Sequence, residues 1–213
     1  MRGSQQRIGA VKMAGFSRQK RLRSLIGVVT IFGSALLCGC YTQVTPPLNP
    51  VHPAVVYLCD YGVHSSLLLP MGPQRYVEYL YGDWNWAARG HTSALDAIGA
   101  VFFSQQSTLG QRFVDQLPGQ SIPRPSDGPN TETPIIVNGD ECSAVVTQLM
   151  QRWEQHRDTA LPPASGMVFV KDNVPYNWTH DCNGLTADCL RDMGCRIDGF
   201  PIWSKFKIVA PAR

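Results

Sequence analysis

The sequence predicts an α+β fold in which an antiparallel sheet packs against helices. Over residues 54–81, short apolar runs rich in β-branched and aromatic residues are separated by turn clusters. Helical periodicity appears later, in two segments of 11 to 15 residues. Because strand and helix signals are mixed without regular βαβ alternation, an α+β architecture is favoured over a doubly wound parallel sheet.

Three strands are expected near the start of the body. Residues 54–59 (AVVYLC) form a buried strand between prolines and the turn signal at 60–62. Residues 63–69 (VHSSLLL) form a second strand, which ends at the Pro/Gly cluster 70–73. Residues 75–81 (RYVEYLY) form the third. Strands joined by so short a turn pair most readily as an antiparallel hairpin.

The later elements are expected to be three helices and three further strands. Apolar side chains stepping by three and four residues after Ser143 indicate an amphipathic helix. The remaining expectations are a helix over 96–105, a loop over 117–134, a strand over 133–138, the amphipathic helix over 143–157, a strand over 167–171, a helix over 183–193 closed by Gly194, and a terminal strand over 202–209.

Charge is unevenly distributed along the chain. Residues 1–39 hold seven of the 19 Lys and Arg residues and no acidic residue, which leaves 12 cations against 16 carboxylates, a net charge of −4, in the rest. A mildly acidic body has no basic stripe to displace phosphate counterions, so nucleic acid is excluded as the expected partner.

The N-terminal segment resembles a bacterial lipoprotein signal. A cationic start is followed by an apolar stretch over 24–39, shorter than the roughly 20 residues that cross a bilayer. Leu37-Cys38-Gly39-Cys40 resembles a lipobox, although Cys38 stands where a small or hydroxyl residue is usual. Cys40 is therefore the expected lipidation site and link to the membrane, and an uncleaved anchor is the alternative.

This signal sets the expected domain boundaries and location. Residues 1–39 are a signal peptide, 40–53 a proline-rich lipidated tether that holds the body off the membrane, and 54–213 a single domain. Tyr41 stands where an aspartate would resemble an inner-membrane retention signal. The expected location is the bacterial outer membrane, facing the periplasm.

Five cysteines follow the lipobox, an odd number. In an oxidising compartment two disulfides would leave one thiol unpaired. The pairing is open among Cys59, Cys142, Cys189 and Cys195. No Cys/His spacing matches a zinc site, so we expect no metal and no organic cofactor.

Cys182 is the candidate nucleophile, because it lies where a helix is expected to begin. Thr179 or Asp181 can cap that helix, and the unpaired N–H groups of its first turn favour thiolate over thiol. His64, on an expected core strand, is the candidate base. The alternatives are a structural or disulfide-bonded cysteine and a hydrogen-bonded strand histidine.

A carboxylate that orients His64 is expected on the neighbouring strand of the hairpin. Alternation favours Glu78 or Leu80, and Glu78 is the one able to accept an imidazole N–H. A solvated strand carboxylate is the alternative, and Asp83 is the reserve candidate. Aromatic residues are expected either to line a substrate groove or to pack in the core: Tyr79, Tyr81, Trp84, Trp86 and Trp178.

Three sequence blocks resemble those of an uncharacterised bacterial envelope family, a domain of unknown function: VVYLCDYGVHSSLLLP, QRYVEYLYGDWNW and YNWTHDCNGLTADCLRDMG. That family is similar to the circularly permuted branch of the NlpC-type papain-like superfamily, in which the histidine strand precedes the cysteine helix. The resemblance spans most of 55–209. It implies Cys182 as nucleophile, His64 as base and Glu78 as orienter. Val63 and Leu185 stand where relatives have aromatics, which affects the pocket walls.

Two functions are therefore expected. The first is a lipid-anchored thiol hydrolase or acyltransferase that acts on an amide or ester of an envelope small molecule, peptide or acyl substrate through Cys182 and His64. The second is a non-catalytic lipoprotein that uses a degenerate papain-like fold to bind an envelope partner. The pH dependence of thiol reactivity distinguishes the two.

Overall fold

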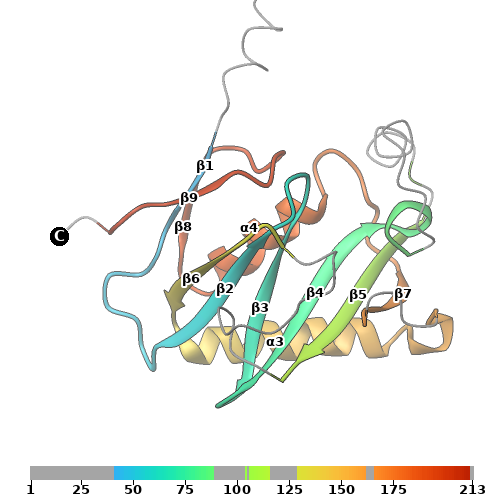
Figure 1. The fold of residues 1–213 in the computed structure, drawn as a ribbon, viewed down its shortest axis with the longest axis horizontal. Coiled ribbons are helices and arrows are strands. Elements are labelled where there is room, and N and C mark those ends of the chain that lie inside the picture. The colour runs from blue at the N-terminus through green and yellow to red at the C-terminus, as the bar shows by residue number, and fades with distance from the viewer. Residues whose placement is uncertain (1–40, 89–103, 105, 116–128, 162–165, 212–213) are drawn as a thin grey trace, which may run out of the picture. The chain divides into compact units, whose positions relative to one another are not determined.

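The computed structural model describes residues 41–88, 104, 106–115, 129–161 and 166–211 (Figure 1). The described chain contains a six-stranded sheet, a three-stranded sheet and two α-helices. Every pairing in the larger sheet is antiparallel, and one of the two pairings in the smaller sheet is parallel. The expected α+β class with a mainly antiparallel sheet is confirmed.

The larger sheet has the strand order β6-β2-β3-β4-β5-β7, which can be followed in Figure 1. Its central hairpin pairs Leu68 with Glu78. The expected strands at 54–59, 63–69, 75–81, 133–138 and 167–171 are confirmed with small shifts of their ends. The bounds are β2 Ala54–Asp60, β3 Ser65–Gly72, β4 Arg75–Asp83, β5 Ser107–Val114, β6 Thr131–Val137 and β7 Val168–Asp172.

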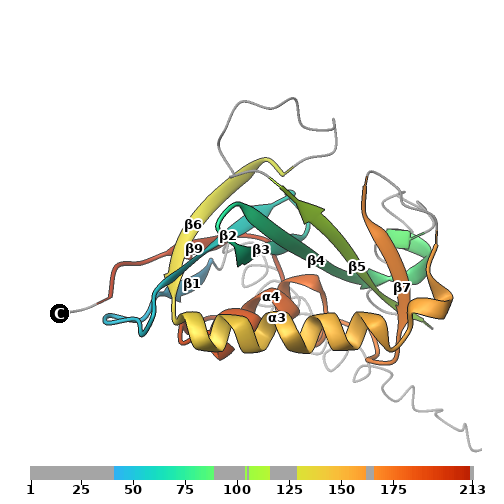
Figure 2. The ribbon, with the colours of Figure 1, turned by 90° about the horizontal axis from the view of Figure 1, so that it is seen from below.

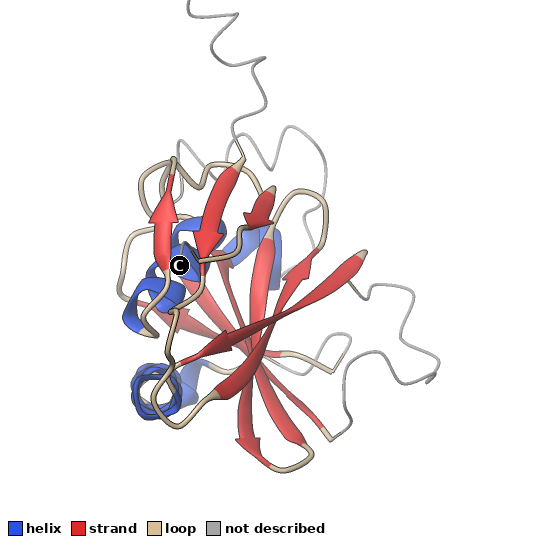
Figure 3. Ribbon diagram, turned by 90° about the vertical axis from the view of Figure 1, so that its left-hand side faces the viewer, coloured by secondary structure: helices blue, strands red, loops and turns tan. Residues whose placement is uncertain are grey.

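The sheet presents different side chains on its two faces because alternate residues of a strand point to opposite sides. On β3, Leu67 and Leu69 pack in the main core with the helices, whereas Leu68 packs in a separate outer cluster with Cys59 and Tyr76. Both α3 (Gly139–Glu154) and α4 (Cys182–Asp192) cover the same face (Figures 2 and 3). The sheet therefore has a helix face and an outer face.

The main core combines apolar side chains of the central strands with one stripe of each helix. On α3 the buried residues recur every three or four positions, the pattern of a helix lying on a sheet. The helix begins four residues before the expected Ser143, at Gly139. Asn138 occupies the N-cap position, and Asp140 and Glu141 place negative charge in the first turn.

The smaller sheet corrects the expected tether at 40–53. β1 (Thr42–Thr45) lies between β8 (Arg196–Asp198), to which it is antiparallel, and β9 (Phe206–Ile208), to which it is parallel. Thr42 and Val44 are 1% and 0% exposed. Residues 42–45 are thus part of the folded body. Four residues followed by prolines give too short a pattern to predict a strand, and its partners lie at the far end of the chain.

Other expectations differ in detail or fall outside the described residues. β5 was not expected, because Ser107-Thr108 and Gly110 interrupt its apolar pattern. The terminal strand is shorter than the expected 202–209. The expected helix over 96–105 lies almost wholly outside the described residues, as do Cys40 and the apolar stretch before it. Among the helices that are described, none is long and apolar enough to cross a membrane.

Candidate active site

Cys182 is the first residue of α4, which begins one residue before the expected start at 183. The helix begins there because Asp181 adopts an extended N-cap conformation and its side chain accepts a hydrogen bond from the Gly184 N–H over 2.7 Å. Burial raises the pKa of the Asp181 carboxyl to about 6, against the hydrogen bonds that lower it. The helix end is therefore capped by a carboxylate that is itself largely buried.

The Cys182 thiol is 7% exposed. Burial and, after it, the Asp181 charge raise its pKa to about 12, against a lowering by the nearby Tyr176 side chain and the backbone N–H groups of Ser65 and Asn183. The lowering expected from the helix N-terminus is thus overcome by desolvation, and the thiol is protonated at neutral pH.

The first turn of α4 is joined to the start of β3 by a buried polar network. The Ser65 hydroxyl donates to Asn183 Oδ1 over 2.8 Å and lies 3.1 Å from Thr186 Oγ1. The Asn183 amide donates to the Ile202 carbonyl over 3.1 Å. These contacts bring residues 64–65 beside Cys182 although the two segments are far apart in sequence. The sequence gives no sign of this network beyond the polar residues at 65, 183 and 186.

His64 lies immediately before β3 and is held by aromatic rings. Its imidazole stacks on Tyr61, with ring centroids 4.6 Å apart and planes 9° apart, and meets the Trp86 ring edge-on at 5.7 Å. Among the described residues its buried Nδ1 has no hydrogen-bond partner. Burial lowers the pKa of His64, although the charges of Glu78 and Asp60 oppose this. The imidazole is therefore neutral at pH 7, as a proton acceptor must be.

Glu78 is fully buried, but its hydrogen bonds go to other residues than His64. Arg112 forms an ion pair with Oε2, and the hydroxyls of Tyr61 and Ser66 each donate to Oε1 over 2.5 Å. The expected hydrogen bond from the imidazole is absent from the described contacts. Glu78 therefore acts on His64 through its charge and through Tyr61. Arg112 lies on β5, the strand that the sequence did not reveal, so this neutralising partner was missed.

The peptide that follows His64 lies beside Cys182, but among the described contacts the two side chains do not touch. The Ser65 N–H reaches the sulfur, and the Ser65 hydroxyl faces α4. Ser66 instead turns to Glu78, and Tyr61, on which the imidazole stacks, packs against the outer cluster. The thiol thus belongs to the helix face and the imidazole to the outer face, and no interaction joins the two side chains among the described contacts.

The aromatic residues expected to line a groove have divided roles. Tyr79 and Tyr81 are buried in the main core, and Trp84 is buried in a separate cluster with Leu80, Met167 and Phe169, which corrects the groove hypothesis for these three aromatic residues. Trp86 packs against His64. Trp178 is 56% exposed and lies 6.4 Å from the ring of Phe200.

The cysteines on the helix face are buried thiols. Cys142, Cys189 and Cys195 form no disulfide within the described chain, and burial raises the pKa of each thiol, in Cys189 to about 12. Cys59 lies in the outer cluster, across the sheet from them. The described residues also hold no group of three His, Cys, Asp or Glu side chains suited to a metal ion.

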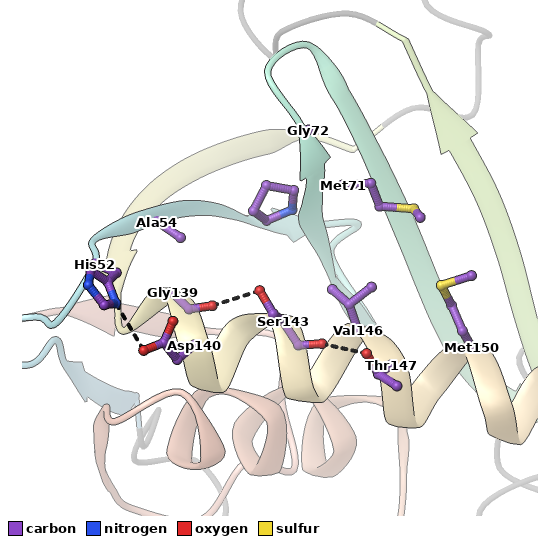
Figure 4. A pocket seen from close by; sticks show the side chains of 11 residues that line it. His52, Ala54, Met71, Gly72, Gly139, Asp140, Ser143, Val146, Thr147 and Met150 are labelled. Atoms are coloured by element: carbon purple, nitrogen blue, oxygen red, sulfur yellow. Dashed lines mark hydrogen bonds and ion pairs between the residues drawn. The ribbon is translucent and has the colours of Figure 1, made fainter.

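A pocket of about 650 Å³ lies elsewhere, between the N-terminal half of α3 and the end of β3 (Figure 4). His52 Nδ1 and Asp140 Oδ2 are 2.9 Å apart at its edge, and both side chains are exposed. The Ser143 hydroxyl donates a hydrogen bond to the Gly139 carbonyl over 2.9 Å. Because the hydroxyl is bonded within its own helix, we assign the pocket no chemistry; none of the expected site residues line it.

Comparison of the chain with family models, with curated proteins and with solved structures found no match. The site is therefore interpreted from its own geometry.

Proposed function

We propose that this protein is a lipid-anchored thiol hydrolase or acyltransferase of the bacterial cell envelope, with a papain-like arrangement in the permuted NlpC-type order. The observation that carries the proposal is the position of Cys182 at the N-terminus of α4, which the Ser65–Asn183 hydrogen bond holds against the start of β3. Ser65 is the residue that follows His64. The candidate base is thus attached to the same peptide that contacts the candidate nucleophile.

The proposed reaction uses only groups of this chain and a carbonyl substrate. The neutral His64 imidazole accepts the Cys182 thiol proton, and the sulfur forms a bond to the carbonyl carbon of an amide or ester. The Cys182 N–H, at the helix start, donates to the oxygen that becomes negative. The bond to the leaving group then breaks, and that group takes the proton from His64. Water, or an acceptor hydroxyl or amine, attacks the thioester and restores the thiol.

Proton transfer requires a rearrangement of His64. Because the imidazole and the sulfur lie on opposite faces of the sheet, the segment before β3 that carries His64 must shift so that the imidazole leaves its stack on Tyr61 and reaches the side of the sulfur. Its unpartnered Nδ1 leaves it free of a competing hydrogen bond among the described residues. Hydrogen bonds of catalytic pairs are often long before substrate binds and tighten in the complex. Glu78, engaged by Arg112, acts in this proposal as a positioning residue through Tyr61.

The test is the pH dependence of Cys182 alkylation by an electrophilic acyl-like probe, followed by peptide mass spectrometry. We expect wild-type Cys182 to react below pH 8. In His64→Ala the rate of Cys182 alkylation should fall by a factor of about ten or more. Cys189 is the matched control, because burial raises the pKa of its thiol to the same value of about 12. Cys189→Ala should leave the profile unchanged, whereas Cys182→Ala should abolish the labelling.

A non-catalytic lipoprotein that binds an envelope partner is the second candidate, and a specific observation favours it. Burial raises the pKa of Cys182 to about 12, and the imidazole packs on the opposite face of the sheet from the thiol. If Cys182 reacts only above pH 9, and equally in His64→Ala, the enzyme proposal fails and this candidate stands.

The anchor at Cys40 is proposed from the sequence alone. Inhibition of lipoprotein signal peptidase should accumulate the precursor, and density-gradient fractionation should recover the processed protein with the outer membrane. Mass spectrometry of the mature N-terminal peptide should show acylated Cys40. An unprocessed chain in untreated cells would contradict the anchor without affecting the chemistry proposed for Cys182.

A further inference from the structure

Exposed apolar side chains gather around the point where the chain enters β1. Of the twelve exposed large hydrophobic residues in the described chain, six belong to this region. They range from 41% to 65% exposed, and together we call them the aromatic patch: Tyr41, Val63, Trp178, Phe200, Ile202 and Trp203. Single exposed apolar residues are ordinary, whereas a contiguous group marks an interaction surface.

The topology of the smaller sheet explains why these residues meet. β8 is antiparallel to β1 and β9 is parallel to it, so the connection 199–205 passes beside the N-terminal end of β1 (Figure 1). A Cβ atom on Gly199 would lie 3.3 Å from the Tyr41 carbonyl oxygen, and the Thr42 N–H donates to the Lys205 carbonyl over 3.0 Å.

Two further contacts bring the rest of the patch to the same place. The Trp178 and Phe200 rings are 6.4 Å apart. The Ser204 hydroxyl donates to the Gly62 carbonyl over 2.8 Å, which places Val63, the next residue, beside the connection. The patch is therefore assembled from four segments of the chain.

The position of the patch identifies its occupant. Tyr41 directly follows Cys40, and consecutive Cα atoms are about 3.8 Å apart. Because residues 42–45 are a folded strand, no tether separates the patch from an acylated Cys40. Acyl chains inserted in the hydrocarbon hold this end of β1 at headgroup level. Trp and Tyr favour that interface, and residues 199–205 include Lys205 and no carboxylate.

We propose that the aromatic patch rests on the bilayer in which the Cys40 lipid is anchored. This inference uses the anchor proposed above. It also bears on the substrate, because the Ile202 carbonyl in the patch accepts a hydrogen bond from the side-chain amide of Asn183, the residue after Cys182. The connection that touches the bilayer is thus hydrogen-bonded to the first turn of α4. The amide or ester attacked by Cys182 is then one presented at the membrane surface.

The test reconstitutes the processed protein, from Cys40 to the C-terminus, in vesicles of phosphatidylethanolamine and phosphatidylglycerol that carry brominated acyl chains. Bromine quenches tryptophans that lie within the interface. We expect quenching of the wild-type emission, and a loss of about half of that quenching or more in Trp178→Phe/Trp203→Phe. Trp84 and Trp153 are buried, so they should contribute little to the quenched signal. Trp86, which packs against His64, is the internal reference.

A matched control removes two exposed apolar residues elsewhere on the body. Val55 and Ile136 are 37% and 52% exposed and face each other across β2 and β6. Val55→Ser/Ile136→Ser should keep wild-type quenching, whereas Phe200→Ser/Trp203→Ser should reduce it. Circular dichroism of all variants verifies that they fold.

Mass spectrometry of the N-terminal peptide separates this proposal from the anchor on which it rests. Acylated protein without quenching overturns the membrane contact and leaves the anchor intact. Quenching that depends on the patch in protein without acylation supports the contact and refutes the anchor. If the patch variants lose a protein partner while quenching is absent, the patch is a protein-binding surface and the membrane proposal is wrong.

Discussion

The single peptide between His64 and Ser65 separates two buried polar regions of opposite character. On the outer face, Glu78 is neutralised by Arg112 and accepts two hydroxyl donors, so its hydrogen-bonding capacity is used within the protein. On the helix face, the Cys182 thiol lies near neutral donors and the Asp181 carboxylate, and no cation offsets its burial among the causes of its raised pKa. The comparison teaches that a buried carboxylate near a histidine can be satisfied by other partners, while burial alone can keep a thiol at a helix N-terminus protonated.

Glu78→Ala should produce the largest effect, since it removes the carboxylate that balances the partly buried Arg112 charge. Removing one member of a buried pair costs about 3–5 kcal/mol of unfolding free energy. Urea denaturation should show a loss of this size, and Glu78→Leu/Arg112→Met should recover most of it. A loss below about 1 kcal/mol would show that the outer face is less dependent on the pair than the geometry indicates.

Alkaline pH should weaken the helix face through Cys182. Its thiol pKa is raised from 9.0 to about 12 in the folded state, so the folded protein retains a proton that the unfolded chain releases. The stability that depends on the protonated thiol is fully present below pH 9 and is lost as the pH rises from 9 to about 12.

Relative to Cys182→Ala, wild-type protein should lose about 1.4 kcal/mol of unfolding free energy per pH unit above pH 9. Urea titrations with reductant at several pH values measure this. The matched variant is Cys142→Ala. Burial raises the pKa of the Cys142 thiol to about 11, so the pH-dependent loss of unfolding free energy due to Cys142 should end at a lower pH than that due to Cys182. Parallel curves for wild type and Cys182→Ala would mean that the thiol is solvated.

Asp181→Ala should have a smaller effect, confined to the start of α4. It removes the acceptor of the Gly184 N–H, a loss of about 1 kcal/mol for an N-cap. Asp181→Asn retains a side-chain oxygen and should restore most of the stability. If urea denaturation finds the two variants equally destabilised, the charge of Asp181 matters more than its hydrogen bond.

The smallest expected effect is on the pKa of His64. NMR titration should give a value below 6.5 in wild type, because burial disfavours the imidazolium. The Glu78 and Asp60 charges oppose this, so Glu78→Gln and Asp60→Asn should each lower the pKa further, by less than about one unit. A wild-type pKa at or above 6.5 would indicate a direct carboxylate partner, as the sequence suggested.

The sequence by itself determined the α+β class, the five strands of the main sheet that carry apolar β-branched runs, and the start of α4 at Cys182. These depend on local signals: apolar β-branched and aromatic runs, Pro/Gly turns, and a helix cap that the sequence left between Thr179 and Asp181 and that Asp181 provides. β1 and β5 escaped prediction because one is four residues long and the other is interrupted by polar residues and glycine.

Only the tertiary structure decided the partners of the predicted site. Whether Glu78 meets His64 or Arg112 depends on which strand lies beyond β4, and a single chain pattern does not encode that order. The pKa of Cys182 likewise depends on its burial and on Asp181, Tyr176 and Ser65, and the sequence does not place Tyr176 or Ser65 beside the thiol. Residue types and local spacing fix where a reactive group sits on its element. Packing fixes its pKa and its neighbours, because both depend on burial by residues distant in the chain.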